Sequence, residues 1–438
     1  MSLTTQPYKG ARDFYPEDKR VQRYMFGVMR QVCESFGYEE YGAPILEPTE
    51  LYLSKGNQEI IDEQTYTFTD RGKRSVTIRT EMTPSVSRMV AARRQESAYP
   101  LRWYSIPNLW RYERPQRGRL REFWQLNVDI FGVEGLEAEH EIIVLADKLM
   151  QAYGAKRSMY DILLSSRELT NFLFGEYLGL SETQRDTLIR LVDRMKKLEK
   201  SSFLAQADAI LAPSQREAGV LPRLQSLLAT KNLADLPEGT QNHPAVERLQ
   251  KLERMLRSSG VSNARFDVTL MRGFDYYTDI VFEVFDTNPE NSRAMFGGGR
   301  YDGLVGLFGV EPVATVGFGM GDVTLENFLR SHKLLPELAP EVDVYVVLIG
   351  EDMYEKAQSP LSLLREAGVK VAVDTSGRKL EKQIKTAEKK GIQTVLFIGE
   401  EDLRNKQFEV KNLVTGLKAT HSIERIASEL LRDRQKRQ

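Results

Sequence analysis

Cysteine and histidine are scarce in this 438-residue sequence. The single cysteine, Cys33, excludes an internal disulfide framework and any zinc site built from several cysteines. The four histidines, His140, His243, His332 and His421, are far apart in the chain, which disfavours a histidine-ligated metal and a histidine-based catalytic triad. We therefore expect no metal ion at a fixed protein site.

The sequence also lacks an excess of charge and any long hydrophobic run. It has 61 Lys and Arg residues against 62 Asp and Glu residues, a net charge of −1, so any nucleic-acid contact has to come from local basic patches. The longest aliphatic stretch, near residues 342–349, is far too short to span a bilayer, and residues 1–16 contain no signal-peptide core. We expect a soluble, cytoplasmic protein without membrane contacts.

What is present is the composition of a globular protein, 41% hydrophobic and 28% charged residues, long enough for about three domains. Helical spacing and strand alternation predict, in order, helix 17–36, hairpin 65–79, helix 82–95, β-rich runs 101–110 and 123–131, and helix 136–153. Strand signals nearly vanish over 166–258, which we interpret as a helical insertion, and return at 264–270, 280–285 and 314–318. This order favours an α+β fold with an antiparallel sheet.

The last part of the chain has a different pattern. Two prolines in residues 333–340 indicate a linker. Beyond it, the strand-like segments VDVYVVLI, VKVAVD and TVLFIG alternate with helical patterns over 353–367 and 379–390. This alternation predicts a small βαβαβ unit.

The densest chemical signal is a group of five arginines within eleven residues, Arg111, Arg114, Arg117, Arg119 and Arg121. Strands are predicted on both sides, which places them on a long hairpin loop. A solvated basic loop is the simplest interpretation. However, Arg111 ends a strand that looks buried, where an unpaired charge is costly, and Phe123 begins the return strand, where an aromatic ring can stack on a base. Guanidinium groups match phosphate oxygens, and no GxxxxGK[ST] loop is present to hold phosphates differently.

Three weaker signals follow. Arg272 and Asp275 stand in a break between two strands, just before the pair Tyr276 and Tyr277, and together they offer a cation and two phenols; half-buried sheet tyrosines are the alternative. Three glycines at 297–299 allow close backbone approach to a ligand or, alternatively, a tight hairpin. Glu81 follows a strand and can face a cationic amino group, although, taken singly, it is more typical of an exposed surface.

Taken together and in order, these segments resemble the class II aminoacyl-tRNA synthetases, and within them the histidyl-tRNA synthetase family. The matching segments are KGARDFYP, FGYEEYGAPILEPTELY (motif 1), WRYERPQRGRLREFWQLNVDIFG (motif 2), and the histidine-specific signatures RGFDYYTDIVFE and GGGRYDGL. The terminal segments LREAGVKVAVD, GRKLEKQIKTAEKKG and VKNL resemble the family's anticodon-binding domain. The resemblance covers nearly the whole chain and matches the helical insertion least.

The resemblance implies three domains and a reaction. They are a class II catalytic domain over 1–165 and 259–332, a helical insertion domain over 166–258, and an α/β anticodon-binding domain over 340–438. The implied reaction activates L-histidine with ATP, accompanied by Mg²⁺, and transfers it to the 3′ end of tRNA(His). The family also implies a homodimer formed through motif 1.

The resemblance also implies roles for individual residues. Arg111 would contact the ATP α-phosphate and the histidine carboxylate, and Arg272 would lie against the α-phosphate. Glu113 and Arg119 would hold ATP, and Phe123 would stack on adenine. The residues implied around the amino acid are Glu81, Thr83 and Gln125 at its head group and Asp129, Tyr276 and Tyr277 around its imidazole. In the terminal domain, Lys382, Lys385 and Lys389 fall on one helix face and could contact tRNA phosphates, although a solvated face is the alternative.

One departure from the family concerns motif 3. The family carries there, in a pattern like GFAMGLERL, an arginine for the ATP γ-phosphate, whereas this chain reads GFGMGDVTL and has Thr324 at that place. In motif 2, Tyr112 and Trp124 stand at positions that are often histidine. Two rivals stay open: a histidine-sensing regulatory paralogue belonging to an ATP phosphoribosyltransferase, and a non-catalytic, synthetase-like protein that binds nucleic acid.

Overall fold

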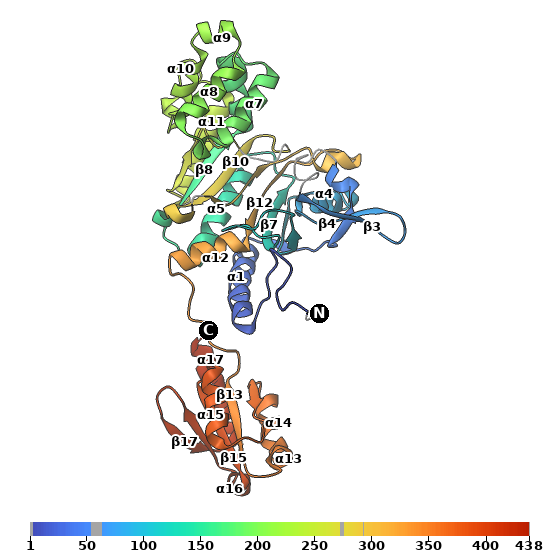
Figure 1. Ribbon diagram of the computed structural model, residues 1–438, viewed down its shortest axis with the longest axis vertical. Coiled ribbons are helices and arrows are strands. Elements are labelled where there is room, and N and C mark those ends of the chain that lie inside the picture. The colour runs from blue at the N-terminus through green and yellow to red at the C-terminus, as the bar shows by residue number, and fades with distance from the viewer. Residues whose placement is uncertain (1–2, 54–63, 272–275, 292, 438) are drawn as a thin grey trace. The chain divides into compact units, whose positions relative to one another are not determined.

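The structure is a computed structural model, and it describes residues 3–53, 64–271, 276–291 and 293–437. The chain forms two compact units, residues 1–335 and 336–438. Figure 1 shows both, with the N-terminal residues in blue and the C-terminal residues in red.

A nine-stranded, mainly antiparallel sheet organises the described part of the first unit. Its strand order is β1-β5-β7-β12-β11-β10-β8-β9, with β6 paired to β7; the pairs at the two edges, β1 with β5 and β8 with β9, are parallel. The strands are β1 Glu39–Glu40, β5 Leu101–Ser105, β6 Asn108–Trp110, β7 Glu122–Phe131, β8 Tyr160–Ser166, β9 Ala264–Phe266, β10 Ile280–Asp286, β11 Ala294–Arg300 and β12 Thr315–Gly321. The predicted α+β fold with an antiparallel sheet is confirmed.

One face of this sheet is apolar and forms the core. Val128 and Phe318 are paired on the neighbouring strands β7 and β12, and the Phe282 ring of β10 contacts Phe318 across Gly298 of β11. All three side chains are almost fully buried. They pack in the same cluster as the apolar stripe of the first predicted helix, including Met29 and Cys33. The helices that contribute to this core are α1 Pro16–Ser35, α5 Glu137–Ala152 and α12 Asp322–Ser331.

The opposite face of the sheet is polar and, at its centre, almost without side chains. The glycines of β11 and β12 pair directly, Gly297 with Gly319 and Gly299 with Gly317, and paired residues of an antiparallel sheet share a face. The sequence predicted a glycine segment that lets a ligand approach the backbone, or else a tight hairpin. The structure places these glycines inside β11, so the tight hairpin is wrong, while close approach of a ligand stays a prediction. The sequence pattern did not reveal this strand because a glycine run carries no strand signal.

The segment predicted as a helical insertion is helical from Arg167 onward. Strand β8 ends at Ser166, whose side-chain oxygen accepts a hydrogen bond from the Leu169 N–H (3.3 Å) and so begins the first helix. The segment stands at one end of the sheet, drawn in green at the top of Figure 1. Its elements are α6 Arg167–Phe172, η2 Leu173–Tyr177, α7 Glu182–Asp193, η3 Met195–Lys197, α8 Lys200–Ile210, α9 Pro213–Glu217, α10 Val220–Leu228, η4 Leu233–Asp235 and α11 Pro244–Ser258.

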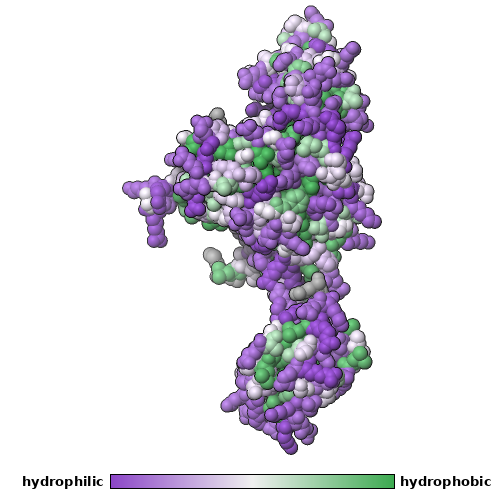
Figure 2. Space-filling view, turned by 180° about the vertical axis from the view of Figure 1, so that it is seen from behind, coloured by the Kyte–Doolittle hydropathy of each residue, from purple (hydrophilic) through white to green (hydrophobic). Residues whose placement is uncertain are grey.

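A small three-stranded sheet lies beside the large one. It consists of β2 Leu46–Pro48, β4 Ser75–Ile78 and β3 Tyr66–Thr69, next to helices α2 Glu50–Leu53 and α4 Thr83–Ala92. Four large apolar side chains around it, Ile45, Leu46, Leu53 and Phe68, are 43–52% exposed. Figure 2 shows hydrophobic surface on the side of the unit from which the β3–β4 hairpin projects.

The second unit contains, among its described residues, a five-stranded sheet in the order β14-β13-β15-β16-β17. The predicted βαβαβ pattern corresponds to the parallel strands β13 Val344–Ile349, β14 Val371–Val373 and β15 Thr394–Gly399 with α13 Met353–Lys356, α14 Gln358–Glu366 and α15 Leu380–Lys389. An antiparallel hairpin, β16 Phe408–Asn412 and β17 Lys418–His421, and the helices α16 Glu400–Asn405 and α17 Ile423–Arg437 complete it. The hairpin escaped prediction because its strands are short and rich in charged residues.

Candidate active site

The arginine-rich segment forms the predicted long hairpin loop between β6 and β7. The Arg111 N–H donates to the Arg121 carbonyl at the base of the loop (2.8 Å), and Gln116 and Arg119 pair near its tip. Gly118 adopts a positive φ of 80° in the tip turn, a conformation that favours glycine. The loop therefore holds Arg111 at its base, next to Phe123 of β7.

Arg111 and Glu81 meet at the inner end of this loop. The Arg111 Nε donates to the Thr80 carbonyl (3.0 Å), which places its guanidinium next to Glu81. Glu81 is only 7% exposed, so the interpretation of an exposed surface residue is wrong for it. Burial raises the pKa of Glu81, and the nearby charge of Arg111 and the hydroxyl of Tyr276 oppose that rise.

Tyr276 connects this pair to the N-terminus of α4. Its hydroxyl donates to Glu81 Oε2 (3.2 Å) and also hydrogen-bonds to the Thr83 side chain. The centroid of the Tyr276 ring lies 5.0 Å from that of Tyr277 and 5.7 Å from that of Tyr301. The three tyrosines form an aromatic wall beside the glycines of the sheet.

Asp129 is the most unusual group on the polar face. Its side chain is buried, and the Tyr301 hydroxyl donates a short hydrogen bond to its Oδ1. Burial raises the pKa of Asp129 to about 7, although the Tyr301 hydrogen bond works in the opposite direction. A carboxylate with a pKa in this range, inside a site, is typical of functional groups.

The glycines of β12 make room for the polar side chains of β7. A Cβ on Gly317 would lie 2.1 Å from Asp129 Oδ1, and a Cβ on Gly319 would lie 2.8 Å from the amide carbon of Gln125. Any larger residue at either place would displace these side chains. The sequence of β12 is therefore matched to the polar residues of its neighbour.

Phe123 continues the same face toward the loop. Side chains alternate along β7, so Phe123 shares the face of Gln125 and Asp129. The Arg111 guanidinium carbon stands 5.4 Å from the centre of the Phe123 ring, and Arg119 forms an ion pair with Glu113 (3.1 Å) in the loop above. One continuous region is thus lined by the Phe123 ring, by the charged groups of Arg111, Arg119 and Glu113, and by the glycines of the sheet.

Thr324 lies at the far end of this region. Its hydroxyl donates to the Met295 carbonyl (2.7 Å), and its methyl group lies 3.5 Å from the position of a Cβ on Gly118. The nearby Arg293 donates to the Gln116 side chain of the loop (2.9 Å). Position 324 therefore supplies no positive charge, but an arginine stands close by.

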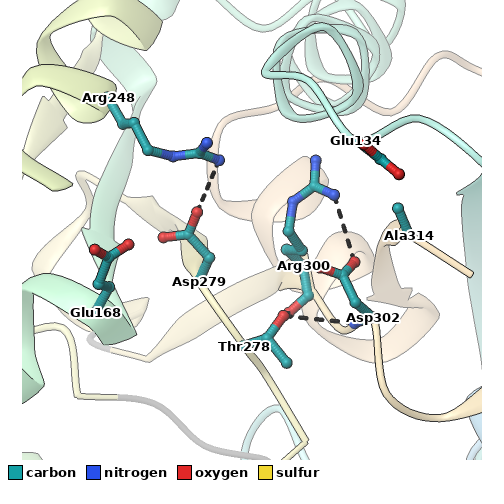
Figure 3. Close-up of a pocket in the computed structure, with 8 residues that line it drawn as sticks. All are labelled: Glu134, Glu168, Arg248, Thr278, Asp279, Arg300, Asp302 and Ala314. Carbon is teal, nitrogen blue, oxygen red and sulfur yellow. Dashed lines mark hydrogen bonds and ion pairs between the residues drawn. The ribbon is translucent and has the colours of Figure 1, made fainter. Parts of the chain in front are cut away.

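Behind Tyr301, a buried ion pair fixes the end of β11. Arg300 makes two hydrogen bonds of 2.7 Å to the carboxylate of Glu139, and both side chains are nearly inaccessible. Arg300 also lines a polar pocket of about 260 Å³ where the helical segment meets the sheet, together with Arg248, which pairs with Asp279 at 2.9 Å (Figure 3). This pocket contains none of the residues expected at the site.

The structure thus gathers most of the residues expected from the sequence. Seven of them lie together on or beside the polar face: Glu81, Thr83, Arg111, Phe123, Gln125, Asp129 and Tyr276. Tyr277 belongs to the aromatic wall, and Glu113 and Arg119 belong to the hairpin loop. Arg272 lies outside the described residues. Lys382, Lys385 and Lys389 belong to the second unit. Sequence reasoning gave no role to Tyr301, although the signature GGGRYDGL contains it.

No group of three His, Cys, Asp or Glu side chains in the described part of the chain is arranged to hold a metal ion. No helix among those residues is long and apolar enough to cross a membrane.

We predict that Asp129 makes the stability of the first unit depend on pH. Its pKa rises from about 3.9 when unfolded to about 7 when folded. The folded state therefore holds the proton more tightly, and stability is greatest below pH 4 and falls as pH rises through 7. Asp129→Asn should remove most of this fall, about 4 kcal/mol at about 1.4 kcal/mol per pKa unit.

Urea denaturation followed by tryptophan fluorescence measures the free energy of unfolding of the first unit, because that unit contains all three tryptophans, Trp103, Trp110 and Trp124. Parallel curves of unfolding free energy against pH for wild type and variant between pH 4 and 8 would contradict the predicted role of Asp129.

Comparison with known proteins agrees with this geometry. A family model described as histidyl-tRNA synthetase matches residues 10–322, and one described as an anticodon binding domain matches residues 343–433. The chain is 40% identical over 422 residues to the histidine–tRNA ligase of Leptospira biflexa, covering 96% of each chain. It is 36% identical over 408 residues to that of Thermoplasma volcanium, covering 93% of this chain and 94% of the other.

The fold is also shared with solved structures. The crystal structure of histidyl-tRNA synthetase from Nostoc sp. PCC 7120 superposes with a TM-score of 0.81 at 23% identity, covering 99% of this chain and 100% of that one. A Bacillus halodurans structure titled as an ATP phosphoribosyltransferase regulatory subunit/histidyl-tRNA synthetase superposes with a TM-score of 0.73 at 22% identity, covering 91% of this chain and 99% of that one. On the evidence of its full-length relatives, this chain belongs to the histidyl-tRNA synthetase family of class II aminoacyl-tRNA synthetases.

Proposed function

We propose that this chain activates L-histidine with ATP and transfers the histidyl group to the 3′ end of tRNA(His) in the cytoplasm. The observation that carries the proposal is the buried Asp129 carboxylate, held by Tyr301 beside an aromatic wall on a surface cleared by glycines. Imidazole presents an N–H donor and a flat ring, and this pocket offers an acceptor and aromatic faces. The relatives named histidine–tRNA ligase and the match to an anticodon-binding domain support the same assignment.

We assign the amino-acid site to the inner end of the polar face. Glu81, Thr83 and Gln125 would take the ammonium group, because all three side chains carry an oxygen acceptor. Glu81 and Thr83 are held together by the Tyr276 hydroxyl. Asp129 would accept the imidazole N–H, with Tyr276 and Tyr277 beside the ring. A site that hydrogen-bonds a polar side chain rejects apolar analogues by about 10⁴–10⁵, so no separate editing step is needed.

The ATP site would extend from there toward the hairpin loop. Adenine would stack on Phe123, Glu113 and Arg119 would hold the nucleotide from above, and Mg²⁺ would arrive with ATP. Arg111 would bridge the α-phosphate and the histidine carboxylate, and Arg272 would lie on the other side of the α-phosphate. Fixed donors of this kind are each worth about 10²–10³ in rate, because they face charge that develops in the transition state.

The chemical step then follows from this placement. An oxygen of the histidine carboxylate attacks the α-phosphorus and forms the acyl–phosphate bond, while the bond to the bridging oxygen breaks and pyrophosphate leaves with the electron pair. Arg111 would stabilise the negative charge that builds on the α-phosphate oxygens. A ribose hydroxyl of the terminal adenosine of tRNA attacks the acyl carbon next, and AMP leaves.

ATP–pyrophosphate exchange with each amino acid in turn tests this function. We expect exchange with histidine alone, because the other amino acids cannot satisfy Asp129 and the aromatic wall together. A regulatory paralogue would bind histidine without exchange, and a non-catalytic accessory protein would show neither. Exchange supported equally by several amino acids would reject the assignment.

We also propose that the chain is a homodimer. The exposed apolar residues around the small sheet, including Leu46 at 43% and Phe68 at 46% exposure, need cover, and contiguous apolar patches on soluble proteins are typically interfaces. Leu46 belongs to the motif 1 segment, residues 36–52. We predict that Leu46→Glu with Phe68→Glu converts a dimer into monomers in sedimentation equilibrium at micromolar concentration, while Tyr15→Glu, at another exposed position, leaves it intact. A monomeric wild type would contradict this.

We propose that α15 contacts tRNA phosphates. Lys382, Lys385 and Lys389 are exposed on one face, with Gln383 and Ala387 buried on the other, and none of the three pairs with a described carboxylate. Three lysines without counter-charges are therefore available to RNA.

Replacing these three lysines by glutamine should raise the KM for tRNA and reduce the log–log salt slope by about one unit per lost phosphate contact. Histidine-dependent exchange should be unaffected. The matched control replaces Lys356, Lys370 and Lys418, which pair with Glu400, Glu341 and Glu409 in the same unit. If both triple variants change the tRNA KM and slope equally, this face has no special role.

A further inference from the structure

The last residue before strand β10, Asp279, joins the helical segment to the sheet. Its Oδ1 accepts a hydrogen bond from the Ser166 hydroxyl (2.9 Å), where helix α6 begins, and its Oδ2 pairs with the Arg248 guanidinium of helix α11 (2.9 Å). The Asp279 carbonyl also accepts from the Arg167 N–H (3.0 Å). One residue therefore contacts both the first and the last helix of the helical segment.

These two helices form one packed body. The Phe172 ring at the end of α6 stacks on the His243 imidazole, with 4.1 Å between centroids, and the His243 Nδ1 accepts a hydrogen bond from the Ala245 N–H at the start of α11 (3.2 Å). Leu169 of α6 and Leu249 of α11 are almost fully buried in the same core. Asp279 is therefore attached to a rigid pair of helices.

The chain segment that contains Asp279 also carries the aromatic wall. Tyr277 lies two residues before Asp279, and the Thr278 N–H between them donates to the Arg300 carbonyl (2.8 Å). Tyr301 follows Arg300 directly, and its ring centroid lies 6.5 Å from that of Tyr277. A change in the position of Asp279 therefore reaches both tyrosines through the backbone, with no flexible side chain in between.

The pair of Arg248 and Asp279 bridges the polar pocket of about 260 Å³ between the helical segment and the sheet (Figure 3). Carboxylates outnumber guanidinium groups in the lining, where Glu134, Glu168, Asp279 and Asp302 stand against Arg248 and Arg300. Glu139 already holds Arg300, so Arg248 supplies the counter-charge for Asp279. Without Arg248, like charges would face the pocket from α6 at Glu168 and from the sheet at Asp279, and like charges repel.

The surroundings of this ion pair make it more than a surface contact. An isolated surface pair contributes little to stability. Here the Asp279 side chain is only 13% exposed and also holds Ser166. The Arg248 Nε is buried and has no hydrogen-bond partner among the described residues, so the guanidinium depends on Asp279.

We propose that Arg248 and Asp279 are positioning residues for the histidine pocket. Through this pair, the helical segment sets the position of Tyr277 and Tyr301 and, with it, the affinity for the imidazole ring. Coupling between two places in a protein is reciprocal, so bound histidine in turn fixes the helical segment against the sheet. This inference rests on the proposed histidine site and adds a contact that regulates it.

The first experiment removes the charge of Arg248 and keeps most of its length. Arg248→Met should weaken histidine binding in calorimetric titration by about 5- to 50-fold, within the usual range for coupled sites, because the two tyrosines are no longer held in place. ATP affinity should stay within twofold of wild type, since the proposed nucleotide site lies toward the hairpin loop. Arg248→Lys keeps the charge and should recover most of the lost affinity.

Arg265→Met is the matched control. Arg265 also pairs with a carboxylate at the edge of the sheet, that of Asp161, at 2.8 Å, and its loss should leave histidine affinity at the wild-type value. An equal loss of histidine affinity in both methionine variants, or an equal loss of ATP affinity in Arg248→Met, indicates general loosening of the fold and overturns the proposal. Unchanged histidine affinity in Arg248→Met overturns it as well.

The second experiment measures the reciprocal effect without catalysis. Hydrogen–deuterium exchange of backbone amides in α11 should slow when histidine is added to wild type. At a histidine concentration that saturates both proteins, Arg248→Met should show no such slowing. If histidine slows amide exchange equally in both proteins, the ion pair does not transmit its effect and the proposal fails.

The proposed function and this coupling can fail separately. If histidine binds and slows amide exchange in α11 but supports no pyrophosphate exchange, the aminoacylation function is wrong and the coupling stands. If histidine does not bind to wild type, both are wrong.

Discussion

The structure depends on one constraint: a carboxylate has to be buried on the open face of a sheet without being neutralised by a cation. Asp129 is held there by the Tyr301 hydroxyl alone among its described hydrogen-bond partners, and burial raises its pKa to about 7. Gly317 is required next to it, because a Cβ at that place would lie 2.1 Å from the carboxylate oxygen. The Arg300–Glu139 pair directly before Tyr301 fixes the strand that delivers the hydroxyl. Sequence features that look unrelated, a glycine in β12 and a buried ion pair, thus serve one group.

The same face joins two kinds of recognition. Near Asp129, a neutral surface with aromatic edges suits a ring with an N–H group. Toward the hairpin loop, Phe123 and the arginines suit a base and its phosphates. Arg111 stands where the two meet, beside Glu81 and over Phe123, and this position fits a group that bridges both substrates. The departure from the family that concerns a phosphate contact is Thr324 at the loop end, where Arg293 already stands nearby.

The fold was largely predictable from the sequence, because long amphipathic helices and alternating strands carry strong periodic signals. Helix α1 and the hairpin β3–β4 lie within one residue of the predicted bounds. Strand β11 was missed because a glycine run has no side-chain alternation, and the run 101–110 proved to be two strands interrupted at Ile106 and Pro107. The family motifs predicted which residues gather on the polar face, and their roles stay predictions. The burial of Glu81 and the contact of Tyr301 with Asp129 depend on long-range packing. The hydrogen bond from Arg121 to the Tyr8 hydroxyl joins residues more than a hundred positions apart, which no local pattern connects.

Calorimetric titration of the Asp129→Asn variant with histidine and with ATP at pH 8 tests the central claim most directly. At this pH the Asp129 carboxylate is largely ionised and imidazole is neutral. The substitution therefore replaces the charged acceptor of a hydrogen bond from the imidazole N–H. The account predicts that the variant binds histidine about 10- to 100-fold more weakly, as expected for loss of such a bond, and binds ATP with unchanged affinity. Unchanged histidine affinity, or an equal loss of ATP affinity, would contradict it.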